Sequence, residues 1–151
     1  MKESTSTALM FGAALFLVLA LIGIAVNVFS PATEAAKTAT TDFSQATTEL
    51  KDQKYLIFDN TTISGSQVVN AIRKFESEGK ASNIGIYVKT GKNSGNWYYN
   101  SLNGDTMTTA QDPKNVNDST NSEYINPSGM FKASIKRDSN QVIRAIEFVQ
   151  N

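Results

Sequence analysis

The sequence contains no cysteine and no histidine. The first absence excludes disulfides and thiol nucleophiles. The second excludes imidazole general bases, histidine zinc ligands and the Ser-His-Asp arrangement of many hydrolases. Any enzyme of this composition would depend on carboxylates, serine and lysine alone. We therefore expect a protein that is not an enzyme and that uses no cofactor and no metal ion.

The chain also lacks an excess of charge of either sign, since 14 Lys and Arg residues balance 14 Asp and Glu residues. A balanced chain has no general electrostatic attraction to nucleic acid, so we expect no nucleic-acid partner. Its 151 residues suit one modest folded domain once an apolar segment is set aside. A small-molecule ligand is not expected either.

One long hydrophobic run is present at residues 8–29, with no charged residue and with Asn27 as its one strongly polar residue. About 22 helical residues, rising about 1.5 Å each, span a hydrocarbon core of about 30 Å. The run is longer than that of a typical cleavable signal peptide, and Lys2 is the only basic residue before it. We predict a transmembrane helix over 8–29, and the alternative is cleavage within residues 31–36.

The flanks of this run indicate its orientation. Residues 1–7 form a short flank in which Lys2 and the terminal amine outweigh Glu3. Because positive flanks favour the cytoplasmic side, we expect the N-terminus in the cytoplasm and the following domain outside it. The sequence thus predicts an integral, single-pass protein of the cell membrane.

Residues 30–53 are predicted to form a helical stalk or linker. Ser30 suits an N-cap and Pro31 suits the first helical position, so we expect a new helix to begin there. Three apolar residues of this segment are spaced by seven, as in a coiled-coil heptad. Such spacing permits self-association near the membrane, but the pattern is shorter than a coiled coil requires, and a solvated spacer is favoured. The heptad consists of three apolar residues: Ala36, Phe43 and Leu50.

Residues 54–151 are predicted to form an extracytoplasmic α+β domain. The apolar run at 55–58 predicts a buried strand. A helix follows, which begins with a capping box of Ser64 and Gln67 and ends at Gly79, a residue suited to a helix C-terminus.

Two hairpins are predicted after this helix. Residues 84–88 alternate between apolar and other side chains and turn into 97–99, and residues 131–136 alternate and turn into 142–149. Strands before and after one helix are typical of the α+β class. The simplest arrangement is a small antiparallel sheet with the helix packed on one face.

The two hairpins are separated by residues 101–129, which are rich in Asn, Ser, Thr and Asp. Such a long polar loop is either functional or loosely ordered, and loose order is favoured here. Oxygen-bearing residues at 115, 117, 119 and 121 have the spacing of a calcium loop. Thr120 stands where that loop needs glycine, however, and Asn126 stands where it needs a bidentate Glu. A polar surface loop is the preferred interpretation.

Two further groups are candidates for functional sites. Ser64 and Ser66 precede a helix, where a nucleophile or an anion site is conceivable, but capping already explains them. The aromatic run at 97–99 suits stacking on sugars, although adjacent strand residues point to opposite faces, which favours packing. The candidate interaction surface consists of four aromatic residues: Trp97, Tyr98, Tyr99 and Tyr124.

The stretch 58–73 reads FDNTTISGSQVVNAIR, with YINP at 124–127 and IEF at 146–148. These residues resemble small single-pass, membrane-anchored proteins of Gram-positive bacteria that carry the pattern F-D-N-T-x-I-S-G-S-Q-V-x-N-A-I. Some of those proteins are encoded near pilus-type or mobile-element genes. The resemblance implies a part in a surface or secretion assembly and brings no catalytic residues. The outline is also similar to a pilin, but no Gly-Phe processing site precedes the apolar run.

These observations predict a non-enzymatic, membrane-anchored structural or interaction protein that presents its domain to protein partners or to itself. The setting is a cell-envelope, pilus-type, secretion or mobile-element assembly. The alternative is an extracytoplasmic binding module for a glycan or a metal ion, which would use the aromatic strand or residues 101–129.

Overall fold

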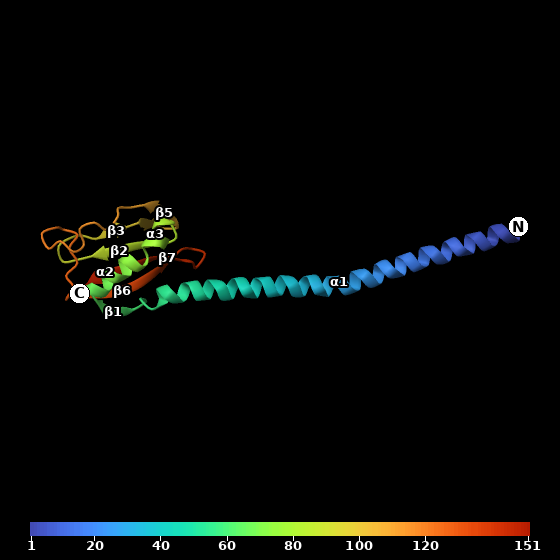
Figure 1. Ribbon diagram of the computed structural model, residues 1–151, viewed down its shortest axis with the longest axis horizontal. Helices are drawn as coiled ribbons and strands as arrows, with labels where there is room; N and C mark the ends of the chain where they lie inside the picture. Colours follow the sequence, from blue (N-terminus) through green and yellow to red (C-terminus); the bar gives the residue numbers. More distant parts are fainter. The chain divides into compact units, whose positions relative to one another are not determined.

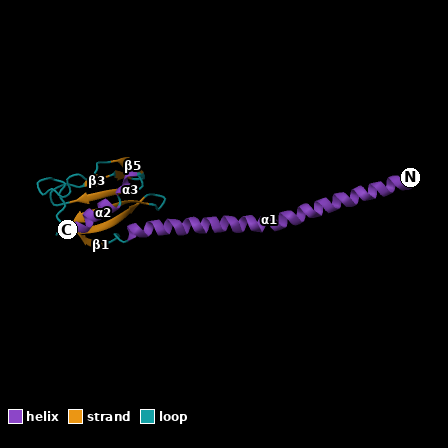
Figure 2. Cartoon of the chain, in the orientation of Figure 1, coloured by secondary structure: helices purple, strands orange, loops and turns teal.

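The computed structural model describes all 151 residues. The chain divides into two compact units, Met1–Glu49 and Leu50–Asn151. Its class is α+β, with a long helix followed by a small mixed sheet (Figures 1 and 2). The predicted α+β class is confirmed.

The first helix, α1, runs without interruption from Lys2 to Leu56. The predicted start of a separate stalk helix at Ser30 is therefore wrong, because Pro31 lies inside α1. A proline removes one backbone hydrogen bond, and residues that favour a helix on both sides keep the rest of the ladder intact. The helix bends gently about midway along its length instead of ending there (Figure 1).

The predicted strand at 55–58 is also wrong. Tyr55 and Leu56 form the last turn of α1, and the amides of Phe58 and Asp59 then donate to the carbonyls of Tyr55 and Leu56, both at 3.0 Å. Tyr55 is buried. A short apolar run suits a buried helix end as well as a strand, so its composition alone does not separate the two.

Five strands form the main sheet, in the order β1-β6-β7-β2-β3. Both predicted hairpins are present, since β2 pairs with β3 and β6 pairs with β7, each pair antiparallel. The sheet is nevertheless mixed, because β2 pairs with β7 in parallel, and the predicted antiparallel sheet is wrong in this respect. The strand bounds are β1 Thr61–Ser64, β2 Gly85–Lys89, β3 Asn96–Tyr98, β6 Met130–Arg137 and β7 Ile143–Gln150.

The parallel pair follows from the helical connection between β1 and β2. Helices α2 (Gly65–Lys74) and α3 (Glu76–Lys80) carry the chain from β1 to β2. A helical crossover of this kind joins strands that point the same way. The later hairpin, β6 with β7, fills the space between them. The result is a βαβ unit with two strands inserted.

The start of α2 is as predicted. The Ser64 hydroxyl accepts a hydrogen bond from the Gln67 amide at 3.4 Å, and the Gln67 side chain accepts one from the Ser64 amide at 3.0 Å. Gly79 lies within α3, however, and the predicted C-terminal cap is wrong. The residue in the left-handed conformation after α3 is Ser82, with φ 59°.

The core of the domain contains side chains from α2, from the sheet and from the turn after α1. Phe58, in that turn, packs edge-on against both Phe75 and Phe148, with ring centroids 5.8 Å apart in each case. The turn is thereby fixed to the folded domain. The largest fully buried apolar side chains are Tyr98, Phe75, Phe131, Phe148, Ile72, Ile84, Ile86, Ile125, Ile146, Val68 and Val88.

The region 101–129 contains more structure than its composition predicts. Strands β4 (Asn100–Asn103) and β5 (Thr106–Thr109) form a separate two-stranded sheet. Further along, the Ile125 amide donates to the Val116 carbonyl at 2.8 Å, and both side chains are buried. Two buried apolar residues thus attach this polar segment to the core.

Candidate interaction surface

Tyr98 and Tyr99 do not belong to the molecular surface. Their exposed fractions are 1% and 4%, so both must be removed from the predicted interaction surface. Tyr98 ends β3, while Tyr99 has φ 64°, which interrupts the alternation of the strand and turns two consecutive side chains inward. Burial raises the pKa of each phenol to about 12, so both remain neutral at physiological pH.

The Tyr99 side chain holds the helices against the sheet. Its hydroxyl donates to the Ile72 carbonyl at 3.1 Å, and its ring lies so close to Gly79 that an added Cβ would be 2.5 Å from it. The conformation of Gly79 is therefore less important than its lack of a side chain. The sequence around Gly79 or Tyr99 does not predict this contact, because the two residues are far apart in the chain.

Trp97 and Tyr124, the other two predicted residues, are half-buried. Trp97 pairs across the strands with Tyr87, with ring centroids 5.2 Å apart, on the sheet face opposite the buried Ile86 and Val88. Tyr124 lies beneath the Lys92 ammonium, which is 5.3 Å from the ring centroid. No ring contact joins Trp97 to Tyr124, so the structure gives two small aromatic patches instead of one platform.

A shallow depression lies beside Tyr124, but it is small. Its volume is about 170 Å³, whereas pockets for small molecules usually measure about 300 to 1,000 Å³. Its polar groups also bond to each other, since the Gln150 side-chain oxygen accepts from the Gly91 amide at 2.9 Å. The lining residues are Thr90, Gly91, Lys92, Tyr124, Asn126 and Gln150.

The two serines before α2 act on each other and on the helix. The hydroxyls of Ser64 and Ser66 lie 2.9 Å apart, and Ser64 also caps the Gln67 amide. Their side-chain hydrogen bonds include no lysine partner. The arrangement stabilises a helix end and does not assemble a nucleophile with a base.

Several side-chain oxygens of the 111–123 segment accept hydrogen bonds from within the segment. Asp118 accepts from the amide and the hydroxyl of Thr120, at 2.9 and 2.7 Å, and Glu123 accepts from the Gln111 side chain at 2.7 Å. The structure contains no cluster of three or more carboxylates that could hold a metal ion.

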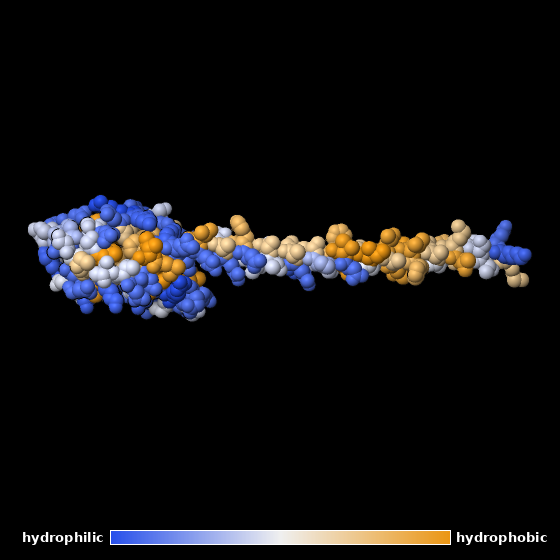
Figure 3. Space-filling view, turned by 90° about the horizontal axis from the view of Figure 1, so that it is seen from below, coloured by the Kyte–Doolittle hydropathy of each residue, from blue (hydrophilic) through white to orange (hydrophobic).

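The first half of α1 has an exposed apolar surface. An 18-residue window of this helix is long and apolar enough to cross a membrane, and none of it is buried. Figure 3 shows hydrophobic residues over most of the half of α1 nearer to residue 1, with hydrophilic residues at its N-terminal end. Phe11, Phe16 and Phe29, for example, are 68%, 72% and 69% exposed.

No family model, curated protein or solved structure matches this chain.

Proposed function

We propose that this chain is an integral membrane protein that crosses the membrane once, with residues 8–29, and presents residues 54–151 outside the cytoplasm. The domain serves as a non-enzymatic structural or interaction module in a cell-envelope, pilus-type, secretion or mobile-element assembly. Its partners are proteins, including other copies of the chain.

The observation that carries this proposal is the exposure of the apolar part of α1. A core helix of a soluble protein passes the same length and composition test, but it would be buried, and this stretch is not. Each large apolar side chain left in water costs about 1.5–3 kcal/mol relative to burial, and the run contains more than ten of them. A lipid bilayer covers such a surface on all sides.

The character of the domain supports a role in binding proteins. It has a packed core, the depression beside Tyr124 is too small for most ligands, and Ser64 and Ser66 lie at a helix start that Ser64 caps. Half-buried aromatic residues such as Trp97 are common contact residues in protein interfaces.

Alkaline carbonate extraction of membranes from cells that make the full chain tests the anchor. We expect the intact chain to stay in the membrane pellet and to be released by detergent. The mass of the recovered chain separates the anchor from a cleaved signal. Recovery of the full-length chain in the carbonate supernatant, or of a chain that begins within residues 31–36, would contradict the proposal.

Crosslinking in the same membranes tests the interaction role. We expect defined crosslinked species, identified by mass spectrometry, that contain either an envelope protein or a second copy of the chain. Detection of the monomer alone across a range of crosslinker lengths would count against this role.

A second candidate function is glycan binding, and it rests on Trp97. This ring is half-buried beside Tyr87 and offers an apolar surface to a sugar face. A glycan array probed with the detergent-solubilised chain distinguishes the two functions. Binding that is lost in Trp97→Ala, but kept in the control Tyr124→Ala, would favour the glycan module.

A further inference from the structure

The second half of α1 has one apolar side. Phe43 is 75% exposed and Leu50 is 67% exposed. Figure 3 shows hydrophobic residues along one side of this half of the helix and hydrophilic residues along the other. The apolar residues follow one another at spacings of three and four: Phe29, Ala32, Ala36, Ala39, Phe43, Ala46 and Leu50.

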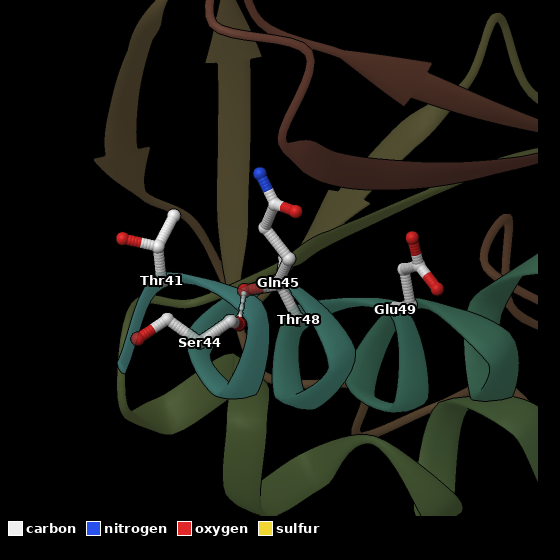
Figure 4. A pocket seen from close by; sticks show the side chains of 5 residues that line it. All are labelled: Thr41, Ser44, Gln45, Thr48 and Glu49. Carbon is white, nitrogen blue, oxygen red and sulfur yellow. Dashed lines mark hydrogen bonds between the residues drawn. The ribbon is translucent and has the colours of Figure 1, made fainter. Parts of the chain in front are cut away.

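The opposite side of the same segment is polar. Figure 4 shows five side chains that project from this side, and all of them carry oxygen or nitrogen. The Thr48 hydroxyl donates to the Ser44 carbonyl at 2.9 Å. These five residues are Thr41, Ser44, Gln45, Thr48 and Glu49. The segment therefore has one apolar and one polar side, as a helix packed against a single neighbour does.

The alternation of three and four has an average period of 3.5 residues. This is the period of a coiled-coil seam, and the alanines supply the second apolar position that the heptad of Ala36, Phe43 and Leu50 lacks by itself. With both positions counted, the pattern covers three successive heptads, which is the minimum for a coiled coil.

Lipid cannot cover the outer part of this side, where Phe43 and Leu50 lie. Phe43 lies 14 residues beyond Phe29, the end of the apolar run, and therefore about 21 Å further along the helix axis. The segment also gains stability from packing, because most helical stability in proteins comes from packing of an amphipathic face and threonine is a weak helix former. Six threonines occur here: Thr33, Thr38, Thr40, Thr41, Thr47 and Thr48.

We propose that residues 29–50 of two copies of this chain form a parallel, in-register, two-stranded coiled coil that starts at the outer end of the membrane span. The parallel direction rests on the proposed function, since two chains anchored by residues 8–29 in one membrane leave it on the same side. The flanking positions are mostly polar, with Thr40 and Thr47 on one side and Asp42 and Glu49 on the other. The seam is thus wide enough for one neighbour only.

The buried area is adequate for such a pair. Phe29, Phe43 and Leu50 of two copies are six large side chains, which together offer on the order of 900 Å² of apolar surface before the alanines are counted. This approaches the roughly 1,200 Å² at which specific protein interfaces begin. Confinement of both copies to one membrane raises their effective concentration and favours the pair further.

Single cysteines test the pairing, because the natural chain has none and gives no background. Ala46→Cys places a thiol in the seam, and the control Thr48→Cys places one on the polar side, two residues away. Both variants are made as full chains, oxidised in their native membranes and examined by non-reducing gel electrophoresis. We expect Ala46→Cys to form the disulfide-linked dimer about tenfold faster than Thr48→Cys, because only seam positions bring identical residues within disulfide reach.

A second pair of variants tests the apolar contact. In a chain that carries Ala46→Cys, Phe43→Glu is expected to reduce dimer formation severely, whereas Thr41→Glu is expected to leave it unchanged. Neither residue belongs to the core of the folded domain. Equal crosslinking at positions 46 and 48, the absence of a dimer at 46, or insensitivity to Phe43→Glu would overturn the proposal.

The same samples separate this proposal from the membrane anchor. A chain that stays in the carbonate-resistant pellet without a dimer at position 46 refutes the coiled coil and leaves the proposed function standing. A chain that is released by carbonate but still crosslinks at 46 and not at 48 supports the pairing and refutes the anchor. Release without such a dimer refutes both.

Discussion

The side-chain amide of Asn100 donates a hydrogen bond of 2.6 Å to the backbone carbonyl of Gly79, 21 residues earlier in the chain. The same amide group donates a second hydrogen bond, of 2.9 Å, to the backbone carbonyl of Ile84. Asn100 is 2% exposed, so these bonds are made away from water. One buried side chain therefore joins α3, the segment before β2 and the start of β4.

We expect Asn100→Ala to destabilise the domain by about 2–3 kcal/mol, because buried carbonyls lose their donors. The fluorescence of Trp97, the single tryptophan, reports unfolding by denaturant in detergent micelles. The control is Asn103→Ala, at the exposed end of β4, which should change stability by less than about 0.5 kcal/mol. Similar losses of stability in the two variants would show that the hydrogen bonds of Asn100 do not stabilise the domain.

Gly79→Ala is expected to destabilise the domain by about 1–3 kcal/mol, although alanine is the better helix former by about 1 kcal/mol. The steric effect prevails because the new Cβ would lie 2.5 Å from the buried Tyr99 ring, which its hydroxyl bond to Ile72 holds in place. Gly91→Ala is the matched control, since its Cβ would have no neighbour closer than 3.8 Å. A stabilised Gly79→Ala variant would contradict the tight packing.

The carboxyl of Asp138 makes the stability of the domain depend on pH. It accepts from Arg144 Nε at 2.8 Å and from the amides of Asn140 and Val142, and the Arg144 bond above all lowers the pKa of the carboxyl below its usual 3.8. A carboxyl whose pKa is lower in the folded state than in the unfolded state stabilises the fold at pH values above its unfolded-state pKa. This stabilisation is lost as the pH falls through the folded-state pKa.

We therefore expect Asp138→Asn to be less stable than the natural chain at pH 7, with a difference that shrinks as the pH falls below about 4. Urea midpoints measured between about pH 7 and pH 3 check this. Carboxyls far from Asp138 titrate equally in both chains and cancel in the comparison. A difference that is independent of pH would exclude the Asp138 charge as its cause.

The features that the sequence predicts correctly are local. The capping box of Ser64 and Gln67 spans four residues, and each hairpin joins strands separated by a short turn. Such patterns are decided by neighbouring residues, which is why the start of α2 and both hairpins are confirmed. The exposure of residues 8–29 was likewise predictable, since an apolar run this long exceeds what a small core can bury.

The features that it misses depend on distant contacts. The sequence predicts Tyr98 and Tyr99 on the surface, but Tyr98 lies on the buried face of β3, opposite Ile86. A φ of 64° at Tyr99, uncommon for a residue other than glycine, turns the next side chain inward as well. Gly79 is needed at its position because the Tyr99 ring lies against it. β2 pairs in parallel with β7 because the hairpin of β6 and β7 inserts between β1 and β2. A strand-helix-strand order was visible, and it is the signal that could have predicted parallel strands.

Substitution within the anchor should weaken membrane attachment. Arginine near the centre of a transmembrane helix costs about 2.5–3.5 kcal/mol per residue, so the double variant Leu15→Arg/Leu19→Arg should lose much of its membrane-bound fraction. The matched control, Thr38→Arg/Gln45→Arg, adds the same charge beyond the apolar run. The carbonate-resistant fraction of each variant is the measurement, and equal fractions would argue against insertion of residues 8–29.

The central claim is that the chain crosses a membrane with its domain outside, and the labelling of single cysteines in intact cells tests it most directly. Ser4→Cys and Lys114→Cys introduce one thiol on each side of the proposed span, in a chain that otherwise has none. With a membrane-impermeant maleimide, we predict labelling of Lys114→Cys in intact cells and labelling of Ser4→Cys only after lysis. Labelling of Lys114→Cys only after lysis would contradict the claim.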